Sequence, residues 1–328
     1  MAFARTIDGD IDPAKLGAVD AHEHLIRTGG GEILVDGEDM RLIDVDKAIT
    51  EARSYQVSAR EFLDVDGTIV DMCPIDCGRD VEKLRAISAA VPGLNIIVTT
   101  GFQKSHMYQE ESTHWISRYS VDQIAELVIA DIEVGVDVND YSGPFVERSA
   151  AKAGVIKIAT SYGVMTDLER KLIEACAAAS VETGCPINTH TQHGTLALDQ
   201  VKLLTSYGVK PEKIAVGHVQ RNPDPYELGK VTETGAYLML DGTYRLKYLP
   251  DSSRVQLLRS LTDAGYGSQL LLGTDSGKKS YQKVYGAATG VDYDMTVFGP
   301  RLLHEGFSET EVRGYYVDNA REFFTFAA

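Results

Sequence analysis

Two histidines near the start of the chain, His22 and His24, are the residues whose type and spacing indicate chemistry most directly. They follow a short apolar stretch at 16–19. Side chains alternate between the two faces of a strand, so residues two positions apart point the same way. Two imidazoles on one face at the end of a strand can share one metal ion. Taken alone, the pair is equally compatible with two surface histidines in a polar turn.

Four further polar residues, Lys157, His190, His218 and Asp275, stand within or directly after apolar runs. Each has a plain structural reading: a lysine that extends to the solvent, hydrogen-bonded core histidines, and an aspartate that caps a loop or helix. A lysine left unpaired in a core is costly, because burial disfavours its charged form. One shared metal site would account for all four residues together with the two histidines.

The number of candidate ligands favours two metal ions over one. Four imidazoles and one carboxylate exceed the three protein ligands typical of one catalytic zinc. A desolvated lysine is nucleophilic as its free amine, and its reaction with carbon dioxide would give a carbamate whose two oxygens can bridge two metals. Lys157 is therefore the candidate bridge. Zinc, manganese and cobalt all suit this set of ligands.

Two loops late in the chain, 242–248 and 276–281, are basic although the whole chain carries a net charge of −16. In α/β barrels, the loops after strands seven and eight often build a phosphate site. Lysine ammonium groups and tyrosine hydroxyls can both bind phosphate. The alternative is a set of solvated surface lysines. The residues concerned are Arg245, Lys247, Lys278, Lys279 and Tyr281.

Bringing the six candidate ligands together requires strands whose carboxyl ends meet. Eight short runs in the sequence are mostly continuous in apolar residues, as expected for parallel strands covered on both sides. Helical patterns separate them. Eight strands alternating with helices predict a (β/α)8 TIM barrel, with a binuclear metal centre at the carboxyl ends of the strands. The predicted strands are 17–22, 68–72, 95–100, 155–159, 186–189, 214–217, 237–240 and 269–273.

Three features support the helical segments between the predicted strands. Helices are expected at 124–134 and 168–183, and Gly184 is a plausible C-cap of the second. The last helix begins with a capping-box pattern at Ser308. The alternative fold, an open doubly wound sheet, would need a glycine-rich phosphate turn after the first strand. The glycines at 29–31 lack that spacing, and we expect a flexible loop there.

Composition is that of an ordinary globular protein. The chain has 328 residues, 44% hydrophobic and 24% charged, and no long linker divides it, so we expect one domain over 1–328. With 32 Lys and Arg against 48 Asp and Glu, the protein repels polyanions, which argues against nucleic acid as a partner. A few local cations could still attract a small anionic substrate.

No apolar stretch is long enough for a membrane span, and the N-terminus lacks the pattern of a signal peptide. We therefore expect a soluble cytoplasmic protein. The chain has four cysteines without the spacing of a four-ligand zinc site, so free thiols are expected. They are Cys73, Cys77, Cys176 and Cys185.

The chain resembles the phosphotriesterase family of the amidohydrolase superfamily. The matching segments run in order through the chain at 20–25, 153–160, 183–191, 217–218 and 273–275. The resemblance implies a binuclear centre, usually of zinc. It places His22, His24 and Asp275 on the more buried metal, and His190 and His218 on the more exposed one. Carboxylated Lys157 and a hydroxide would bridge the two metals.

Within the family, the sequence is similar to the branch of phosphorylated-sugar lactonases. That similarity places Lys247, Lys278 and Tyr281 on the substrate phosphate. The expected reaction is hydrolysis of a five- or six-membered sugar lactone by attack of the bridging hydroxide. Asp275 would take the hydroxide proton and return it to the departing alkoxide.

Other functions remain open from the sequence. The nearest are a phosphotriesterase or an acyl-homoserine lactonase, although the latter branch usually has an arginine where this chain has Gly242. A mononuclear deaminase would not need Lys157, and a sugar-phosphate-binding protein would keep only a vestigial metal site. A homodimer is a family expectation. Segment 102–108 should line the pocket, without assigned roles for Lys104, His106 and Tyr108.

Overall fold

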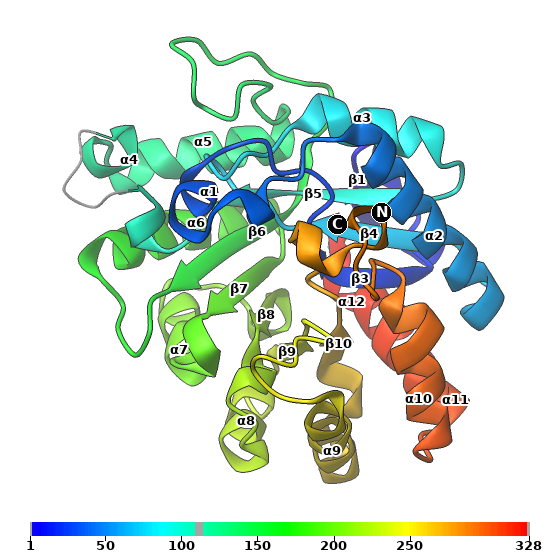
Figure 1. Ribbon diagram of the computed structural model, residues 1–328. Helices are drawn as coiled ribbons and strands as arrows, with labels where there is room; N and C mark the ends of the chain where they lie inside the picture. The colour runs from blue at the N-terminus through cyan, green and yellow to red at the C-terminus, as the bar shows by residue number, and fades with distance from the viewer. Residues whose placement is uncertain (1, 109–113, 327–328) are drawn as a thin grey trace.

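The protein is a (β/α)8 barrel, as the sequence predicted; the computed structural model describes residues 2–108 and 114–326 (Figure 1). Eight parallel strands pair in chain order, from β3 to β10. The ends of this sheet meet where the Asp275 amide donates to the His22 carbonyl at 2.8 Å. The strands are β3 (Ala18–Glu23), β4 (Gly67–Asp71), β5 (Asn95–Gly101), β6 (Ala153–Thr160), β7 (Ile187–Thr191), β8 (Ile214–Gly217), β9 (Tyr237–Leu240) and β10 (Leu270–Leu272).

Helices surround the strands as an outer layer (Figure 1). The predicted capping box at Ser308 and the C-cap at Gly184, with a φ of 72°, are both present. A further capping box at Ser120 starts its helix three residues before the predicted position 124. The helices are α1 (Gly31–Asp36), α2 (Val45–Leu63), α3 (Val81–Ala90), α4 (Trp115–Arg118), α5 (Val121–Glu133), α6 (Asp167–Thr183), α7 (Ala197–Ser206), α8 (Pro225–Thr232), α9 (Asp251–Leu261), α10 (Gly299–His304), α11 (Glu309–Arg313) and α12 (Asn319–Phe324).

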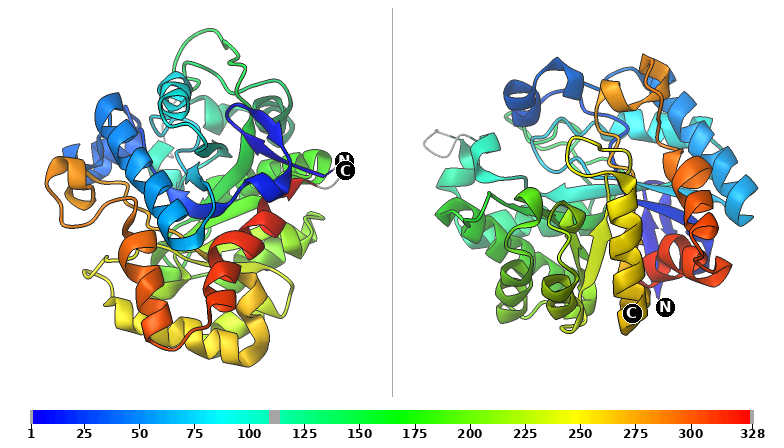
Figure 2. Two further views of the ribbon diagram at one scale, coloured as in Figure 1. Left: turned by 90° about the vertical axis from the view of Figure 1, so that its right-hand side faces the viewer. Right: turned by 60° about the horizontal axis from the view of Figure 1, so that its bottom comes forward.

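The end of the barrel away from the strand carboxyl ends is closed by the two ends of the chain. Strands β1 (Phe3–Thr6), β2 (Gly9–Ile11) and β11 (Thr325–Phe326) form a small antiparallel sheet that the sequence did not predict. The chain ends therefore lie side by side (Figure 2). Phe323 and Phe324 of α12 pack in one cluster with residues of the barrel interior. This closure leaves the opposite end free to carry a site.

Gly29 and Gly30 lie in a loop, as we expected, whereas the third glycine of 29–31 already belongs to a helix. Gly31 begins α1, and Gly30 has a φ of 85°. A side chain at Gly30 would lie 2.6 Å from the carbonyl oxygen of Asp76, so the turn is tightly packed. Backbone proximity and left-handed geometry, rather than looseness, explain this use of glycine.

Among the described residues, no helix combines the length and the apolar character needed to cross a membrane. All four cysteines are buried free thiols, as the sequence indicated.

Candidate metal centre and active site

A cavity of about 700 Å³, including its open mouth, lies at the carboxyl ends of the barrel strands. Every residue that the sequence predicted as a metal ligand lines it, although the six come from five strands or the segments directly after them. Parallel strands bring their carboxyl ends to one face of a barrel, which is where TIM-barrel enzymes carry their sites. The six are His22, His24, Lys157, His190, His218 and Asp275.

His22 in β3 and His24 directly after it face the cavity because this strand is irregular. Ala21 belongs to the barrel interior, so strict alternation would turn His22 away from it. The pairing of β3 with β4 shifts in register between Asp20 and Glu23, as at a β-bulge. After the shift, His22 and His24 both line the cavity.

Asp275 lies at the centre of the imidazole cluster. One carboxylate oxygen is 3.9 Å from Nε2 of His22 and 3.7 Å from Nε2 of His24. The other is 3.9 Å from Nδ1 of His218. The His190 ring meets the His218 ring edge-on, with centroids 4.4 Å apart. One carboxylate therefore joins three imidazoles, and the fourth stands beside them.

All four imidazoles are suited to bind metal at neutral pH. Burial is the main cause that lowers the pKa of each well below the ordinary value of 6.5, and nearby cationic side chains lower it further. The neutral imidazole is the form that offers a lone pair to a metal. The exposed fractions are 1% for His22, 4% for His24, 9% for His190 and 2% for His218, so His190 is the most open to the cavity mouth.

Lys157 reaches the cavity from the interior face of β6. Val155 packs in the barrel interior, whereas Ile156 and Ile158 pack outside it, so alternation directs Lys157 inward. Its side chain is only 1% exposed, and Nζ donates to the Met72 carbonyl at 3.0 Å. The amine thus lies in a buried position beside the histidines.

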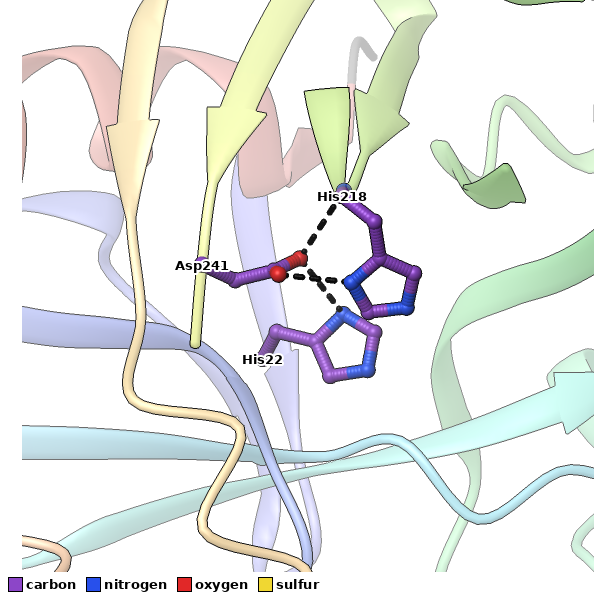
Figure 3. Close-up of side chains that lie close together, drawn as sticks. All are labelled: His22, His218 and Asp241. Carbon is purple, nitrogen blue, oxygen red and sulfur yellow. Dashed lines mark hydrogen bonds and ion pairs between the residues drawn. The ribbon is translucent and has the colours of Figure 1, made fainter. Parts of the chain in front are cut away.

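Asp241, directly after β9, is a functional residue that the sequence reasoning did not assign (Figure 3). Oδ1 accepts from Nδ1 of His218 at 2.6 Å, and Oδ2 accepts from its backbone amide at 3.2 Å. Oδ2 also lies 3.5 Å from Nδ1 of His22. Because an ionised carboxylate only accepts, His218 carries its proton on Nδ1 and keeps Nε2 bare. The position of Asp241 at the end of a predicted strand was the feature of the sequence that could have identified it.

Two of the cavity residues adopt left-handed backbone conformations. His218 has a φ of 61° and Asp275 a φ of 47°. Such conformations cost a residue other than glycine about 1–3 kcal/mol and concentrate at functional sites. His218 directly follows β8 and Asp275 follows β10 by three residues, and both side chains line the cavity.

The donor set fits a pair of divalent metal ions. Four neutral imidazoles, a carboxylate and an amine offer nitrogen and oxygen ligands that suit zinc, manganese or cobalt. Nδ1 of His22 is buried and has no hydrogen-bond partner among the described residues. The Asp275 carboxylate is paired with guanidinium groups of Arg245 at 2.9 Å and Arg221 at 3.3 Å, so this position already favours positive charge.

The rest of the cavity wall is strongly cationic. Lys247 and Lys278, predicted to bind phosphate, both line it. Four more cations line it. Lys104 and Arg245 lie in segments that the sequence predicted at the site, whereas Arg27 and Arg221 were not predicted there. Arg221 follows the strand-end His218 by three residues, which could have identified it. The additional cations are Arg27, Lys104, Arg221 and Arg245.

Tyr281 is not among the residues that line this cavity. Its ring instead lies beneath the guanidinium of Arg245, with 5.0 Å between the ring centroid and the guanidinium carbon.

Segment 102–108 contains residues to which the sequence assigned no roles. Lys104 lines the cavity, and its Nζ donates to Gln192 Oε1 at 2.8 Å. The His106 side chain is exposed, whereas Tyr108 is buried and donates to the Ile75 carbonyl at 3.1 Å.

Known proteins match this chain over nearly its whole length. The model of the phosphotriesterase family matches residues 2–324. A phospho-furanose lactonase of Mycoplasmopsis synoviae is 40% identical over 99% of this chain and 92% of its own length. A lactonase structure from Listeria monocytogenes superimposes with a TM-score of 0.88 at 33% identity, covering 99% of this chain and all of that one. The phosphotriesterase homology protein of Escherichia coli, solved with phosphate in its active site, has a TM-score of 0.84 at 29% identity, covering 96% and 100%.

Proposed function

Because this chain belongs to the phosphotriesterase family, whose members depend on a binuclear metal centre, and is a hydrolase acting on ester bonds, we propose that it opens lactones of phosphorylated sugars. Two relatives at 40% and 38% identity bear the name phospho-furanose lactonase. Their similarity spans 99% of this chain. These names support a lactonase activity and a phosphorylated furanose substrate.

The observation that carries the substrate proposal is the charge of the cavity wall. In a protein of net charge −16, six cations besides Lys157 line this one cavity, against the carboxylates Glu32 and Asp275. Guanidinium and ammonium groups form strong charge-assisted hydrogen bonds with phosphate. A neutral phosphotriester or an acyl-homoserine lactone would gain little from such a wall. The six are Arg27, Lys104, Arg221, Arg245, Lys247 and Lys278.

We assign the metal ligands as the sequence indicated. His22, His24 and Asp275 would hold one ion, and His190 and His218 the other. A carbamate on Lys157 would lie between them. When bound, two divalent ions of this kind, of which zinc is the first choice, make water a nucleophile at neutral pH and polarise a carbonyl.

In the proposed mechanism, the protein's side chains bind the phosphate and carry the proton. Lys247 and Lys278 hold the phosphate, so that binding energy remote from the reacting bond orients the ring. Tyr281 supports the cationic cavity wall through the stacking of its ring against the guanidinium of Arg245. Water adds to the carbonyl carbon and the ring C–O bond breaks. Asp275 takes the proton of the attacking water and returns it to the alkoxide leaving group.

The test is a panel of phosphorylated and free aldonolactones, assayed on samples whose metal content is measured. We expect kcat/KM to favour the phosphorylated compounds, and Lys278→Ala to lower it for these alone by about 10- to 100-fold, the worth of one charged hydrogen bond. Lys279→Ala is the matched control, because Lys279 is the next residue of the same loop and does not line the cavity. Equal turnover of both classes, or preference for a neutral phosphotriester or an acyl-homoserine lactone, would contradict the proposal.

A further inference from the structure

One ligand histidine, His24, rests against the thiol of Cys73. The sulfur lies 3.1 Å from Nδ1 of His24 and 3.2 Å from the carbonyl oxygen of Ile26. Cys73 follows β4 by two residues and is completely buried. The mechanism proposed above gives this thiol no role.

Counting protons determines the direction of these contacts. A carbonyl oxygen accepts only, so the contact with Ile26 uses the single proton of the thiol. The nearby Asp71 carboxylate accepts from the backbone amides of Leu25 at 2.8 Å and Cys73 at 3.2 Å, so it is an acceptor as well. Both contacts of the sulfur are satisfied together only when the sulfur accepts from His24. The proton of the imidazole must then be on Nδ1, which leaves Nε2 bare, 3.7 Å from Asp275.

We propose that Cys73 is a positioning residue that fixes the tautomer and the ring orientation of His24, so that Nε2 is presented to the metal. This inference rests on the metal centre of the proposed function. A metal-binding histidine usually donates its second ring proton to an outer partner that holds the ring. Here the outer partner is a neutral thiol.

The two sides of the centre differ in this respect. His218 donates to the Asp241 carboxylate at 2.6 Å, whereas His24 donates to sulfur at 3.1 Å. A carboxylate partner raises the basicity of an imidazole, and a neutral thiol lacks the negative charge that does so. Cys73 thus orients its histidine without adding negative charge to the more buried side of the site.

A different role for the same atoms is a third metal site, because ligand atoms of His24, Asp71 and Cys73 lie within 4.8 Å of one another. The hydrogen bonds argue against it. Both oxygens of Asp71 already accept backbone amides, and burial beside the Asp71 carboxylate raises the pKa of the Cys73 thiol, which favours the thiol over the thiolate that a metal needs. Metal counting separates the two roles.

The experiment compares metal binding by the wild-type chain and three variants, all prepared metal-free. Cys73→Ala removes the acceptor, and Cys73→Ser keeps one donor and one acceptor in place. Cys176→Ala is the control, because Cys176 is equally buried but packs in the apolar cluster outside the barrel. The free zinc concentration at half-loading is measured by chelator competition, the bound zinc is counted, and the thermal midpoint of each metal-free chain is recorded.

We expect Cys73→Ala to raise the half-loading concentration by about 10- to 100-fold, as loss of an outer partner typically does. Cys73→Ser should restore it to within a few-fold, and Cys176→Ala should leave it unchanged at two zinc ions per chain. If Cys73→Ala unfolds when metal-free, the zinc affinities of Cys73→Ser and wild type are compared instead. The ¹⁵N shifts of the His24 ring are then measured in both zinc-loaded proteins. The proposal requires a protonated Nδ1 in both.

Three results would overturn the inference. They are wild-type affinity in Cys73→Ala, an unrescued loss in a stably folded Cys73→Ser, and a third zinc ion that disappears on substitution of Cys73. Failure of the wild-type chain to bind two metal ions would instead overturn the proposed function.

Discussion

Asp241 illustrates how one carboxylate can organise the site without being counted among its ligands. It is fully buried and contacts His218 through two hydrogen bonds, with His22 at 3.5 Å (Figure 3). The carboxylate fixes the tautomer of the His218 imidazole and lies close to the His22 imidazole. Residues of this kind are needed because the donor atoms must be held in place before a metal arrives.

We expect Asp241→Asn to weaken metal binding and lower kcat/KM by about 10- to 100-fold. An amide oriented to donate would oppose the Nδ1 proton of His218, although the shape of the side chain is kept. Zinc retention after dialysis and steady-state kinetics measure the effect. Glu212→Gln, an exposed substitution remote from the cavity, serves as the control. Unchanged zinc retention in Asp241→Asn would show that His218 needs no such partner.

Lys157 offers a second test at the residue scale. Lys157→Met keeps a buried unbranched side chain but cannot form a carbamate. The loss of the proposed bridge should reduce bound metal below two ions per chain and activity by about 100-fold or more, since metal chemistry supplies several kcal/mol of transition-state stabilisation. Lys152→Met, in the segment just before the same strand, is the control. A Lys157→Met chain that keeps two metals and full activity would remove the carbamate from the mechanism.

At the scale of elements, β3 and the segment after β10 are joined beneath the site by a buried polar contact. The Thr274 hydroxyl contacts Asp20 Oδ2 at 2.7 Å and also Glu23 Oε2. One hydroxyl has one proton to donate, so the second contact is best satisfied by a protonated carboxyl group. Burial raises the pKa of Asp20 well above its ordinary value and that of Glu23 to about 8.

This raised pKa predicts how the stability of the metal-free protein depends on pH. Between about 4.5 and 8 the folded chain binds more protons at Glu23 than the unfolded chain, so stability falls as pH rises through this window. The site histidines, whose pKa values are lowered, act in the opposite direction, and their effect fades as pH rises above the unfolded pKa of about 6.5. Asp140 and Asp294, whose pKa values burial raises to about 7, add to the decline. Urea unfolding from pH 6.5 to 8 should therefore show a decline, by up to about 1.4 kcal/mol per pH unit for one proton.

Glu23→Gln should make that decline shallower by the share of one proton, because the amide cannot titrate and retains an acceptor oxygen for the same contacts. As the control, the free energies of unfolding of the variant and the wild type are compared at a fixed pH of 6.5. This comparison separates the loss of a titrating group from a general loss of stability. A wild-type stability that is constant or rising between pH 6.5 and 8, or an equal decline in Glu23→Gln, would contradict the prediction.

Local patterns predicted the barrel well because parallel strands covered on both sides are continuous in apolar residues. The predicted runs 214–217 and 237–240 coincide with β8 and β9. The small sheet of β1, β2 and β11 was missed because its strands are at most four residues long and one pairing joins opposite ends of the chain. Such non-local pairing leaves no local periodicity to detect.

The candidate site was predictable where chemistry and position coincide in the sequence. Histidines at strand ends can be recognised as candidate ligands in the sequence. The roles of Asp241 and Cys73 depend on their contacts with His218 and His24, which are known only from the folded structure. The irregularity of β3 is the clearest case: spacing two residues apart put His22 and His24 on one face, but only the register shift determines that this is the inner face. Arg27 and Arg221 were not predicted because their places in the cavity depend on the path of the loops that carry them.

On the scale of the whole molecule, charge is unevenly distributed. The chain carries −16 overall, yet cations dominate the lining of the cavity at one end of the barrel. At an ionic strength of 0.1 M the Debye length is about 10 Å, so a small anion at the cavity mouth responds to the nearby cations more than to the distant surface. The acidic surface then disfavours large polyanions without excluding a small phosphorylated substrate.

Salt should therefore act on charged and neutral substrates differently. Raising sodium chloride from about 0.05 to about 0.5 M shortens the Debye length roughly threefold. This change should lower kcat/KM for a phosphorylated lactone by about tenfold and leave kcat/KM for a free lactone unchanged. Lys278→Ala should make the first slope shallower, because one of the attracting charges is gone. Steady-state kinetics at constant metal concentration give both slopes. The opposite result is a kcat/KM for the phosphorylated lactone that rises with salt. It would mean that repulsion by the net charge of −16 outweighs attraction by the cavity cations. The phosphate would then have to be recognised by short-range contacts alone, without electrostatic attraction at a distance.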